Sequence, residues 1–271
     1  MPRGHFYHLG AFVRYAQFDY HPSRPAATAD PLRDWWGQHW EGRSGFRADL
    51  SDEPLWPTIR DALRVPGRVL EAGCGYGQWV AFLERLGHQV VGIDYVTSGL
   101  RAGKSADASL RLMRADFRQL PFGDATFDTV VSFGAVEHDI GGPEASLREF
   151  FRVLRPSGRL LCSVPCLNGE RLATLPWAAL RDWLKCRPTL RRLAGKEEPF
   201  EFYEYLFTPA TYRAILERTG FIVDDLRTYG VSTENQVALK LGAPLARRFR
   251  FYNPHMMMAV CRRSASGSPR L

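Results

Sequence analysis

The stretch VLEAGCGYGQWVAFLERLG, residues 69 to 87, decides the fold. Apolar residues lead into Glu71, and a glycine then occupies every second position of a short loop: Gly73, Gly75 and Gly77. A helical pattern follows from Gln78, with Gly87 as its expected end. A buried strand, a glycine loop and a helix form the repeating unit of parallel sheets. Such a loop lets a ligand lie against bare backbone at the start of a helix.

The spacing of the glycines excludes two common phosphate-binding loops. A dinucleotide fingerprint, GxGxxG, needs a glycine at position 78, where this chain has Gln78. A phosphate-binding loop of the form GxxxxGK followed by Ser or Thr is also absent from the sequence. The loop therefore predicts a ligand other than a dinucleotide or a nucleoside triphosphate.

Strand-like and helix-like segments alternate on both sides of this stretch. Helical patterns begin at Gln78, Ser98, Pro143 and Pro209. Seven strands are expected, at residues 68–72, 89–94, 110–116, 127–133, 159–164, 221–229 and 255–261. This alternation predicts an α/β fold: a doubly wound, mostly parallel seven-stranded sheet with helices on both faces.

Three further segments frame this core, which we expect over residues 51–263. Residues 1–50 are predicted to form an N-terminal helical arm that carries Trp35, Trp36 and Trp40. These side chains either close over a ligand or pack the arm onto the core. Residues 167–206 interrupt the alternation and are predicted to be an inserted helical cap over the substrate. Residues 264–271 are expected to be a flexible tail.

Composition narrows the class of protein. Of the 271 residues, 45% are hydrophobic and 24% are charged, as in soluble globular domains. No apolar run reaches the length of about 18 residues that a membrane-spanning helix needs. Five scattered cysteines show neither a zinc-type spacing nor an even disulfide set, so we expect no metal and a cytoplasmic location.

The net charge of +7 lies in one segment. From Lys240 onward there are seven Lys or Arg residues and no Asp or Glu, so the preceding residues are formally balanced. A basic segment of this kind suits nucleic acid, an acidic lipid surface or an anionic substrate, or is simply solvated.

Acidic residues end the second and third predicted strands. Asp94 can accept both hydroxyl groups of a ribose. Asp116 and Phe117 suit an adenine, with a carboxylate for its amine and an aromatic ring beside it. Because carboxyl ends of parallel strands share one edge of the sheet, these groups are expected to meet there. The predicted ligand is a nucleoside without a pyrophosphate.

Several motifs in order resemble those of class I S-adenosylmethionine-dependent methyltransferases, of the type 11-like group that acts on small molecules. They are VLEAGCGYG, VVGIDY, ADFRQLPFGDATFDTVVSFGAVEH and RVLRPSGRLLCSVP, and they cover about residues 66–166. The resemblance implies S-adenosylmethionine as cofactor and S-adenosylhomocysteine as product. Members that methylate base amines carry an Asn/Asp-Pro-Pro-aromatic motif where this chain has FGAVEH, so nucleic acid is not expected as a substrate.

The resemblance also implies roles for individual residues. The loop and Glu71 would face the amino-acid part of the cofactor, Asp94 its ribose, and Tyr95 and Asp116 its adenine. The residues implied at the cofactor are Glu71, Gly73, Cys74, Gly75, Gly77, Asp94, Tyr95, Asp116, Phe117, Ser132, Phe133 and Gly134.

Glu137 and His138 follow the fourth predicted strand and are the candidate catalytic residues. A base is needed only where the acceptor keeps its proton near neutral pH, so His138 is either that base or a positioning group. We expect methyl transfer to a small organic acceptor, most simply at oxygen. The alternatives are a lipid, quinone or glycolipid acceptor at a membrane surface, and a non-catalytic protein that binds the cofactor. The acceptor and the oligomeric state stay open.

Overall fold

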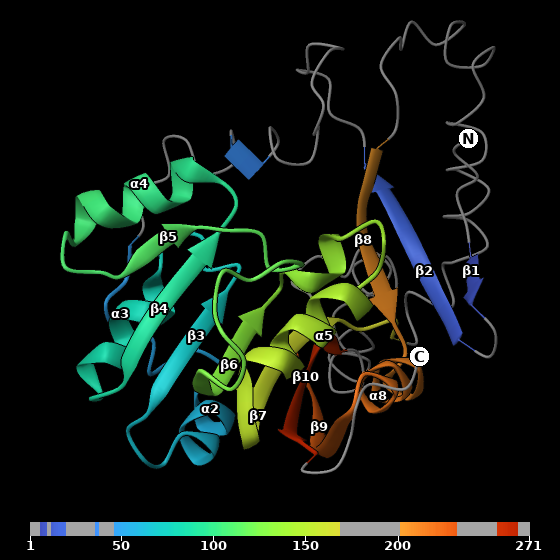
Figure 1. The fold of residues 1–271 in the computed structure, drawn as a ribbon. Coiled ribbons are helices and arrows are strands. Elements are labelled where there is room, and N and C mark those ends of the chain that lie inside the picture. The colour runs from blue at the N-terminus through green and yellow to red at the C-terminus, as the bar shows by residue number, and fades with distance from the viewer. Residues whose placement is uncertain are drawn as a thin grey trace, which may run out of the picture.

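The computed structural model describes residues 6–9, 12–19, 36–37, 46–168, 201–231 and 254–264. Their central feature is one seven-stranded sheet, shown in Figure 1. Its strands, in spatial order, are β5 (Leu112–Arg114), β4 (Gln89–Asp94), β3 (Arg68–Ala72), β6 (Phe127–Phe133), β7 (Leu154–Pro165), β10 (Pro254–Arg263) and β9 (Phe221–Val231).

The sheet is parallel except at one place. Strands β5, β4, β3, β6 and β7 pair in parallel, whereas β10 runs antiparallel to both of its neighbours, β7 and β9. Chain order and spatial order therefore differ, because β10 follows β9 in the chain but lies between β9 and β7. All seven strands predicted from the sequence are present in this sheet, so the predicted fold class is confirmed.

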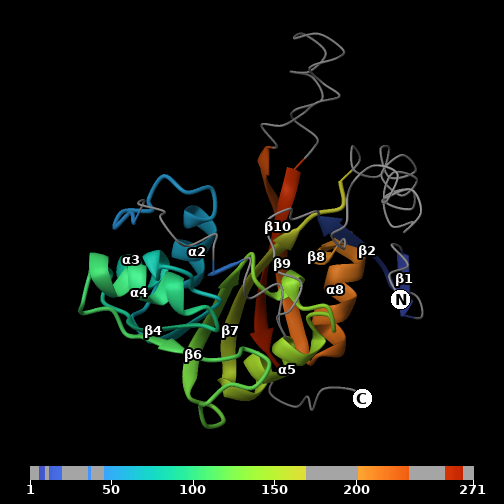
Figure 2. The same cartoon turned by 90° about the horizontal axis from the view of Figure 1, so that it is seen from above.

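Helices cover both faces of the sheet, as Figure 2 shows from above. Helices α2 (Trp56–Ala62), α3 (Gln78–Arg85) and α4 (Thr97–Ala106) pack on one face, and α5 (Glu144–Val153) and α8 (Pro209–Arg218) pack on the other. Successive strand residues contribute to opposite sides: Val130 and Leu160 join the cluster with α5 and α8, and Val131 and Leu161 join the other. Burial on both faces explains why these strands read as unbroken apolar runs.

A second, antiparallel sheet contains β1 (Phe6–Leu9), β2 (Phe12–Asp19) and β8 (Glu201–Phe207). The prediction that residues 1–50 form a helical arm is therefore wrong for residues 6–9 and 12–19. The prediction of a helical cap is likewise wrong for residues 201–206. Strand propensity depends on a pairing partner, and here β2 pairs with residues that lie far along the chain. Residues 169–200 of the expected cap lie outside the described residues.

The second sheet joins the core at the carboxyl end of β7. The backbone amide of Leu167 donates to the Phe207 oxygen at 2.7 Å, and Cys166 forms a parallel bridge with the same residue. In Figure 1, β8 and β2 stand beside α5 and α8. This attachment brings β8 next to the segment that follows β6, where the candidate catalytic residues lie.

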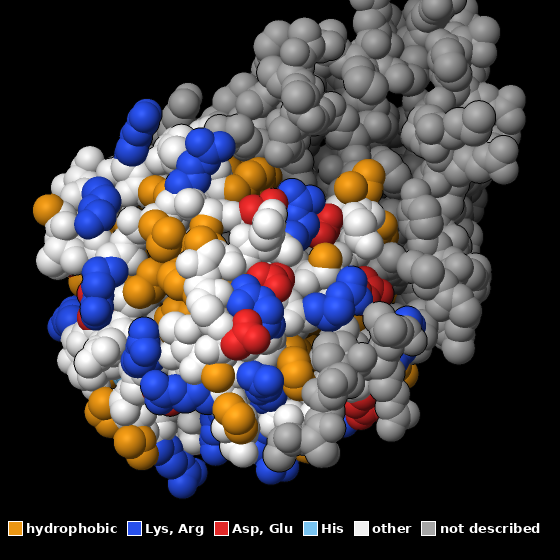
Figure 3. Space-filling view, in the orientation of Figure 1, with side chains coloured by type: hydrophobic (Ala, Val, Ile, Leu, Met, Phe, Trp, Pro, Cys, Tyr) orange, Lys and Arg blue, Asp and Glu red, His pale blue; other side chains and the backbone are white. Residues whose placement is uncertain are grey.

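Two arginines of the basic C-terminal segment have partners within the fold. Arg262 pairs with Asp224 at 2.7 Å, and Arg263 lies over the Phe151 ring at 4.6 Å. On the face seen in Figure 3, Lys and Arg side chains are scattered among carboxylates and apolar groups. Among the described residues, no helix combines the length and hydropathy needed to cross a bilayer.

Candidate functional site

The glycine loop between β3 and α3 holds all three of its glycines at positive φ, 80° at Gly73, 52° at Gly75 and 75° at Gly77. A Cβ atom on Gly73 would lie 2.4 Å from the Ala135 Cβ, and one on Gly77 would lie 2.7 Å from the Leu112 Cδ2. Larger residues would therefore strain the backbone and collide with neighbouring segments. The loop is fixed as bare backbone at the carboxyl end of the sheet.

Helix α4 packs directly on the outside of this loop. A Cβ on Gly99 would lie 3.0 Å from the carbonyl oxygen of Gly75, and one on Gly103 would lie 2.0 Å from that of Tyr76. The two α4 glycines are four positions apart and so share one helix face. They allow the helix to approach the loop at backbone contact distance.

Asp94 joins the end of β4 to the glycine loop. Its Oδ2 accepts a hydrogen bond from the Gly75 amide at 2.9 Å, and its Oδ1 accepts one from the Val96 amide at 2.9 Å. Burial raises the pKa of the carboxyl, and the hydrogen bonds from Val96 and Gly75 oppose this shift. A carboxylate offers about four acceptor sites, so both contacts leave room for a ligand's hydroxyl groups.

Asp116 and Phe117 lie at the same edge, beyond β5. Phe117 borders the loop, since its Cε1 would be 4.0 Å from a Cβ on Gly73. The carboxylate of Asp116 accepts hydrogen bonds from the amide of Arg118 at 2.8 Å and from its Nη2 at 2.7 Å. Burial acts to raise the pKa of Asp116, but these hydrogen bonds and the charge of Arg118 outweigh it and lower the pKa. An adenine amine at Asp116 would share the carboxylate with Arg118.

Glu137 and His138 form a short 3₁₀ turn, η1 (Val136–His138), directly after β6. The Glu137 side chain is 2% exposed, and its Oε1 lies 4.0 Å from the Nε2 of His138, whose side chain is 11% exposed. Glu204 of β8 completes the group, because the ligand atoms of all three side chains lie within 4.8 Å of one another. The Trp36 ring meets the His138 ring edge-on at 5.0 Å. We call these three side chains, Glu137, His138 and Glu204, the carboxylate–imidazole cluster.

Comparison with known proteins identifies the family. Residues 70–162 match a family model described as a methyltransferase domain. A demethylmenaquinone methyltransferase of Beutenbergia cavernae is 36% identical over 216 residues, which cover 70% of this chain and 85% of that protein. The chain belongs to the class I S-adenosylmethionine-dependent methyltransferases.

Two further comparisons, one of sequence and one of structure, cover different shares of this methyltransferase. A probable S-adenosylmethionine-dependent methyltransferase of Mycobacterium tuberculosis is 37% identical over 97 residues, and the match spans 36% of this chain and only 35% of that relative's length. A solved structure of Burkholderia thailandensis 1,6-didemethyltoxoflavin-N1-methyltransferase superposes with a TM-score of 0.57, covering 96% of this chain and 99% of that one at 18% identity. That structure contains S-adenosylhomocysteine, and its likeness shows a shared fold.

The residues of the methyltransferase fit the cofactor of its family. Glu71 is buried, and the backbone of Val80 in the first turn of α3 hydrogen-bonds its carboxylate. Its other oxygen, Oε2, has no hydrogen-bond partner within the described part of the chain. Burial raises the pKa of Glu71 well above its ordinary value. A buried acceptor without a donor, beneath a loop of bare backbone, suits the ammonium group of a methionine chain.

The remaining predicted cofactor residues divide by what their side chains contact. The hydroxyl of Ser132 is wholly buried and donates to the Ala72 oxygen at 2.9 Å. The Phe133 ring packs against Trp79 of α3 at 5.4 Å. Burial raises the pKa of the Cys74 thiol well above its ordinary value, which keeps it protonated. The side chains of Ser132 and Phe133 therefore contact β3 and α3.

Two other predicted residues, Tyr95 and Gly134, lie beside Asp94 and Glu137 respectively. The Tyr95 carbonyl oxygen accepts a hydrogen bond from Arg114 Nε at 3.3 Å, and its side chain is half-buried. Gly134 has a φ of 68°, and a Cβ there would lie 3.6 Å from the Glu137 Oε1. Gly134 therefore links the glycine-loop edge of the sheet to the carboxylate–imidazole cluster.

Sequence reasoning missed two residues of this site. Glu204 lies in EFYEYLF, a run rich in aromatic residues, and that composition could have indicated a strand. Arg118 follows Asp116 by two positions, a spacing that carries no structural signal of its own. Trp36 was named in the predicted arm, whereas Trp35 and Trp40 lie outside the described residues.

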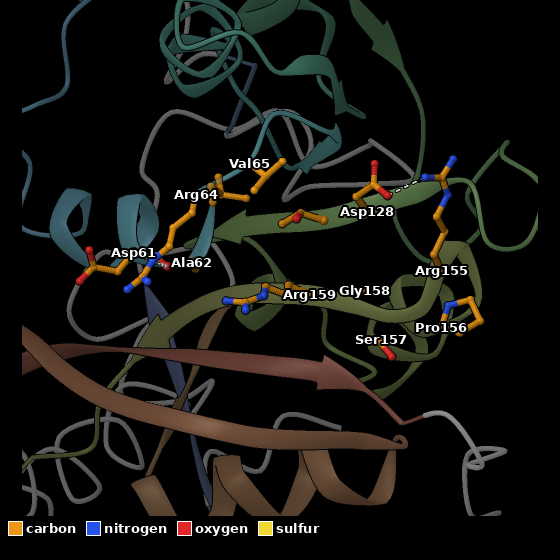
Figure 4. A pocket seen from close by; sticks show the side chains of 12 residues that line it. Asp61, Ala62, Arg64, Val65, Asp128, Arg155, Pro156, Ser157, Gly158 and Arg159 are labelled. Atoms are coloured by element: carbon orange, nitrogen blue, oxygen red, sulfur yellow. Dashed lines mark hydrogen bonds and ion pairs between the residues drawn. The ribbon is translucent and has the colours of Figure 1, made fainter.

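A cavity of about 590 Å³ lies at the opposite end of the strands from this site. Figure 4 shows Asp128 and Arg155 joined across one side of it, at 2.6 Å. Arg64 and Arg159 also line it. Ligands of open α/β sheets bind at the carboxyl ends of the strands, so this cavity at the amino end of β6 is separate from the cofactor site.

Proposed function

We propose that this protein transfers a methyl group from S-adenosylmethionine to a small organic acceptor, most simply at oxygen, in the reducing cytoplasm that its scattered cysteines favour. The observation that carries the proposal is the carboxylate–imidazole cluster. It places a buried Glu137 and a His138 beside Gly134, at the sheet edge that holds the glycine loop. Polar groups buried at that place serve an acceptor rather than the core.

When bound, S-adenosylmethionine supplies an activated methyl carbon on a sulfonium. The chain's own task is to orient the acceptor and to keep water away from it. The glycine loop, held by Asp94 and α4, fixes the cofactor side. The Trp36 ring packs edge-on against His138 and so adds an apolar wall on the acceptor side. A hydroxyl acceptor must also lose its proton, and the cluster is where that proton or the resulting oxyanion is accommodated.

A second candidate acceptor is a quinone-type lipid. The Beutenbergia cavernae relative is named a demethylmenaquinone methyltransferase, and it is similar over most of its length. A demethylated menaquinone is larger and more apolar than most metabolites. The fold in common makes this acceptor class the first one to compare with small phenols.

The test uses the full chain, methyl-labelled S-adenosylmethionine, and two acceptor sets. One set holds water-soluble phenols and hydroxylated aromatics, and the other holds a demethylated menaquinone in its reduced form, dispersed in detergent. Label in a methyl ether of the first set supports the leading proposal. Label only in the quinone supports the second.

Transfer to neither set, with S-adenosylhomocysteine still bound in calorimetry, would favour a non-catalytic cofactor-binding protein. The variant Asp94→Ala serves as the background control in every assay, because it removes an acceptor from the cofactor site without touching the cluster. Failure of S-adenosylhomocysteine to bind at high concentration would overturn the proposed function altogether.

A further inference from the structure

We propose that Glu137, His138 and Glu204 bind one divalent metal ion of the first transition series. Two elements far apart in the chain supply the ligands: η1 gives a carboxylate and an imidazole, and β8 gives a second carboxylate. Their ligand atoms lie within 4.8 Å of one another. In the described part of the chain, no other three His, Cys, Asp or Glu side chains are grouped this closely.

The strongest support for a bound cation is one carboxylate oxygen. Glu137 is 1% exposed, and its Oε2 has no hydrogen-bond partner among the described residues. A carboxylate out of water is costly unless it is paired or coordinated. Glu204 adds a second negative charge beside it rather than a compensating one. A divalent cation among the three side chains would neutralise both carboxylates and give the unpartnered oxygen a ligand bond.

The donor set selects the kind of metal. Carboxylate oxygens suit Mg²⁺, Ca²⁺ and Mn²⁺, whereas imidazole nitrogen suits Zn²⁺, Fe²⁺ and other transition ions. Two carboxylates and one imidazole thus favour Mn²⁺, Fe²⁺ or Zn²⁺. Three protein ligands also leave coordination positions open, as catalytic rather than structural metal sites do. The sequence predicted no metal, because that prediction rested on cysteine spacing and could not place Glu204.

The site lies near the glycine loop, so the methyl acceptor would occupy the open coordination positions of the metal. Glu137 Oε1 borders Gly134, and Ala135 in turn touches the glycine loop at Gly73. A hydroxyl oxygen bound to the metal would lose its proton to water more readily, because a coordinated His138 cannot accept it, and the metal would hold the resulting oxyanion near the cofactor. This role rests on the proposed function, whereas binding of the ion does not.

The test measures metal binding without turnover. The full chain is treated with chelator and then titrated with Mn²⁺, and free Mn²⁺ is followed by electron paramagnetic resonance. We expect one Mn²⁺ per chain. Glu204→Gln, at a half-buried residue, and Glu137→Gln should each weaken binding at least tenfold. The matched control Glu217→Gln, on the exposed face of α8, should bind as the wild type does.

A second measurement identifies the nitrogen ligand. Spin-echo modulation from a coordinated imidazole should appear in the wild type and disappear in His138→Asn. Circular dichroism shows whether each variant is folded. If Glu137→Gln does not fold, Mn²⁺ binding by Glu204→Gln still tests the site. Weak binding that is unchanged in both Gln variants, or no binding at millimolar Mn²⁺, would overturn the proposal.

S-adenosylhomocysteine binding is measured in parallel on the metal-free chain. Intact cofactor binding without Mn²⁺ binding would overturn only the metal site and leave the imidazole as the proton acceptor. Loss of cofactor binding with normal Mn²⁺ binding would instead overturn the proposed function and leave the metal site standing.

Discussion

Two buried carboxylates at the ends of neighbouring strands differ in the hydrogen bonds that their oxygens accept. Asp94 accepts backbone hydrogen bonds on both oxygens, from Gly75 and Val96. Glu71 is bound through the backbone of Val80, and its Oε2 has no hydrogen-bond partner among the described residues. Asp94 is thus part of the loop's own hydrogen-bond network. Burial of the Glu71 carboxylate lowers the stability of the fold, and a ligand that donates a hydrogen bond to it can offset this loss.

Replacing Glu71 by Gln should stabilise the free protein. Burial raises the pKa of Glu71 in the folded state, so the folded protein holds this proton to higher pH than the unfolded chain does. Stability therefore falls as pH rises between the unfolded and the folded pKa, by at most about 1.4 kcal/mol per pH unit. Denaturant unfolding at pH 5 and pH 8 should show a Glu71→Gln gain that is larger at pH 8.

The same variant should bind S-adenosylhomocysteine more weakly, because the charged acceptor beneath the loop is lost. The exposed Glu217→Gln is its control and should change neither quantity. A gain in stability of equal size at both pH values would show that the raised pKa is not its cause.

Asp94→Asn should weaken S-adenosylhomocysteine binding about tenfold to a hundredfold, as expected for loss of hydrogen bonds to a charged group. An amide has one acceptor oxygen, so it cannot serve both Gly75 and Val96 and also a ribose. Isothermal calorimetry measures the change, with the exposed Asp61→Asn as control. Unchanged affinity would remove Asp94 from the cofactor site.

Sequence reasoning located the residues whose place follows from the strand pattern. Asp94 and Asp116 end predicted strands, and a parallel sheet brings such ends together. Glu204 and Arg118 escaped because their positions depend on tertiary contacts: a strand pairing across the chain in one case, and a local ion pair in the other. The hydroxyl of Ser132 had a hidden partner in Ala72 for the same reason.

At the level of elements, helix α4 packs against the glycine loop at backbone contact distance. Gly103→Ala adds a Cβ that would lie 2.0 Å from the backbone oxygen of Tyr76. Alanine would favour an isolated helix by about 1 kcal/mol over glycine. Here the collision should reverse the sign, lower the free energy of unfolding by about 2 kcal/mol or more, and weaken cofactor binding.

Gly123→Ala is the matched control, since its nearest neighbour would be the Thr126 Oγ1 at 3.7 Å. Denaturant unfolding and calorimetry compare the two variants. A Gly103→Ala protein as stable as Gly123→Ala would mean that α4 does not need its close approach to the loop.

Helix α8 begins as its sequence predicts. Thr208 is the N-cap, its Oγ1 accepts from the Thr211 amide at 3.1 Å, and Pro209 occupies the first turn. Thr208→Ala should cost about 1 kcal/mol of unfolding free energy, and Thr208→Ser should restore it. Urea unfolding of the three proteins measures this, and an equal loss in both variants would point to the threonine methyl group instead of the cap.

Elements of the core were predictable because their signals are local. Strands buried on both faces are continuous apolar runs, and caps and glycines mark helix ends. Strands β1 and β2 were wrongly expected to be helical. The contact that decides their structure is the pairing of β2 with β8, which joins distant residues such as Arg14 and Phe207. No window of neighbouring residues contains that pairing.

On the scale of the whole molecule, β10 joins the edge strand β9 to the five parallel strands of the large sheet. It pairs with β7 on one side and with β9 on the other. Met257 and Met258 send their side chains into the two opposite cores. A chain that ends after residue 253 should therefore lose cooperative unfolding and expose apolar surface, seen as dye binding and aggregation.

Removal of residues 265–271, which belong to the flexible tail expected over residues 264–271, should leave the melting temperature within about 2 °C of the intact chain, since a loose terminus adds few contacts. Cooperative unfolding of the shorter chain without β10 would show that the sheet is complete without its antiparallel strand.

The position of β10 in the sheet also determines when the sheet can be completed during translation. As the chain leaves the ribosome, β3 to β7 can pair in the order of their synthesis, but β9 emerges before the strand that joins it to the sheet. Until residues 254–263 appear, β7 has an open edge, the kind of surface that pairs with other chains. Slow translation or a pause shortly before residue 254 would prolong that exposure, so the nascent chain is most dependent on chaperones just before residues 254–263 emerge.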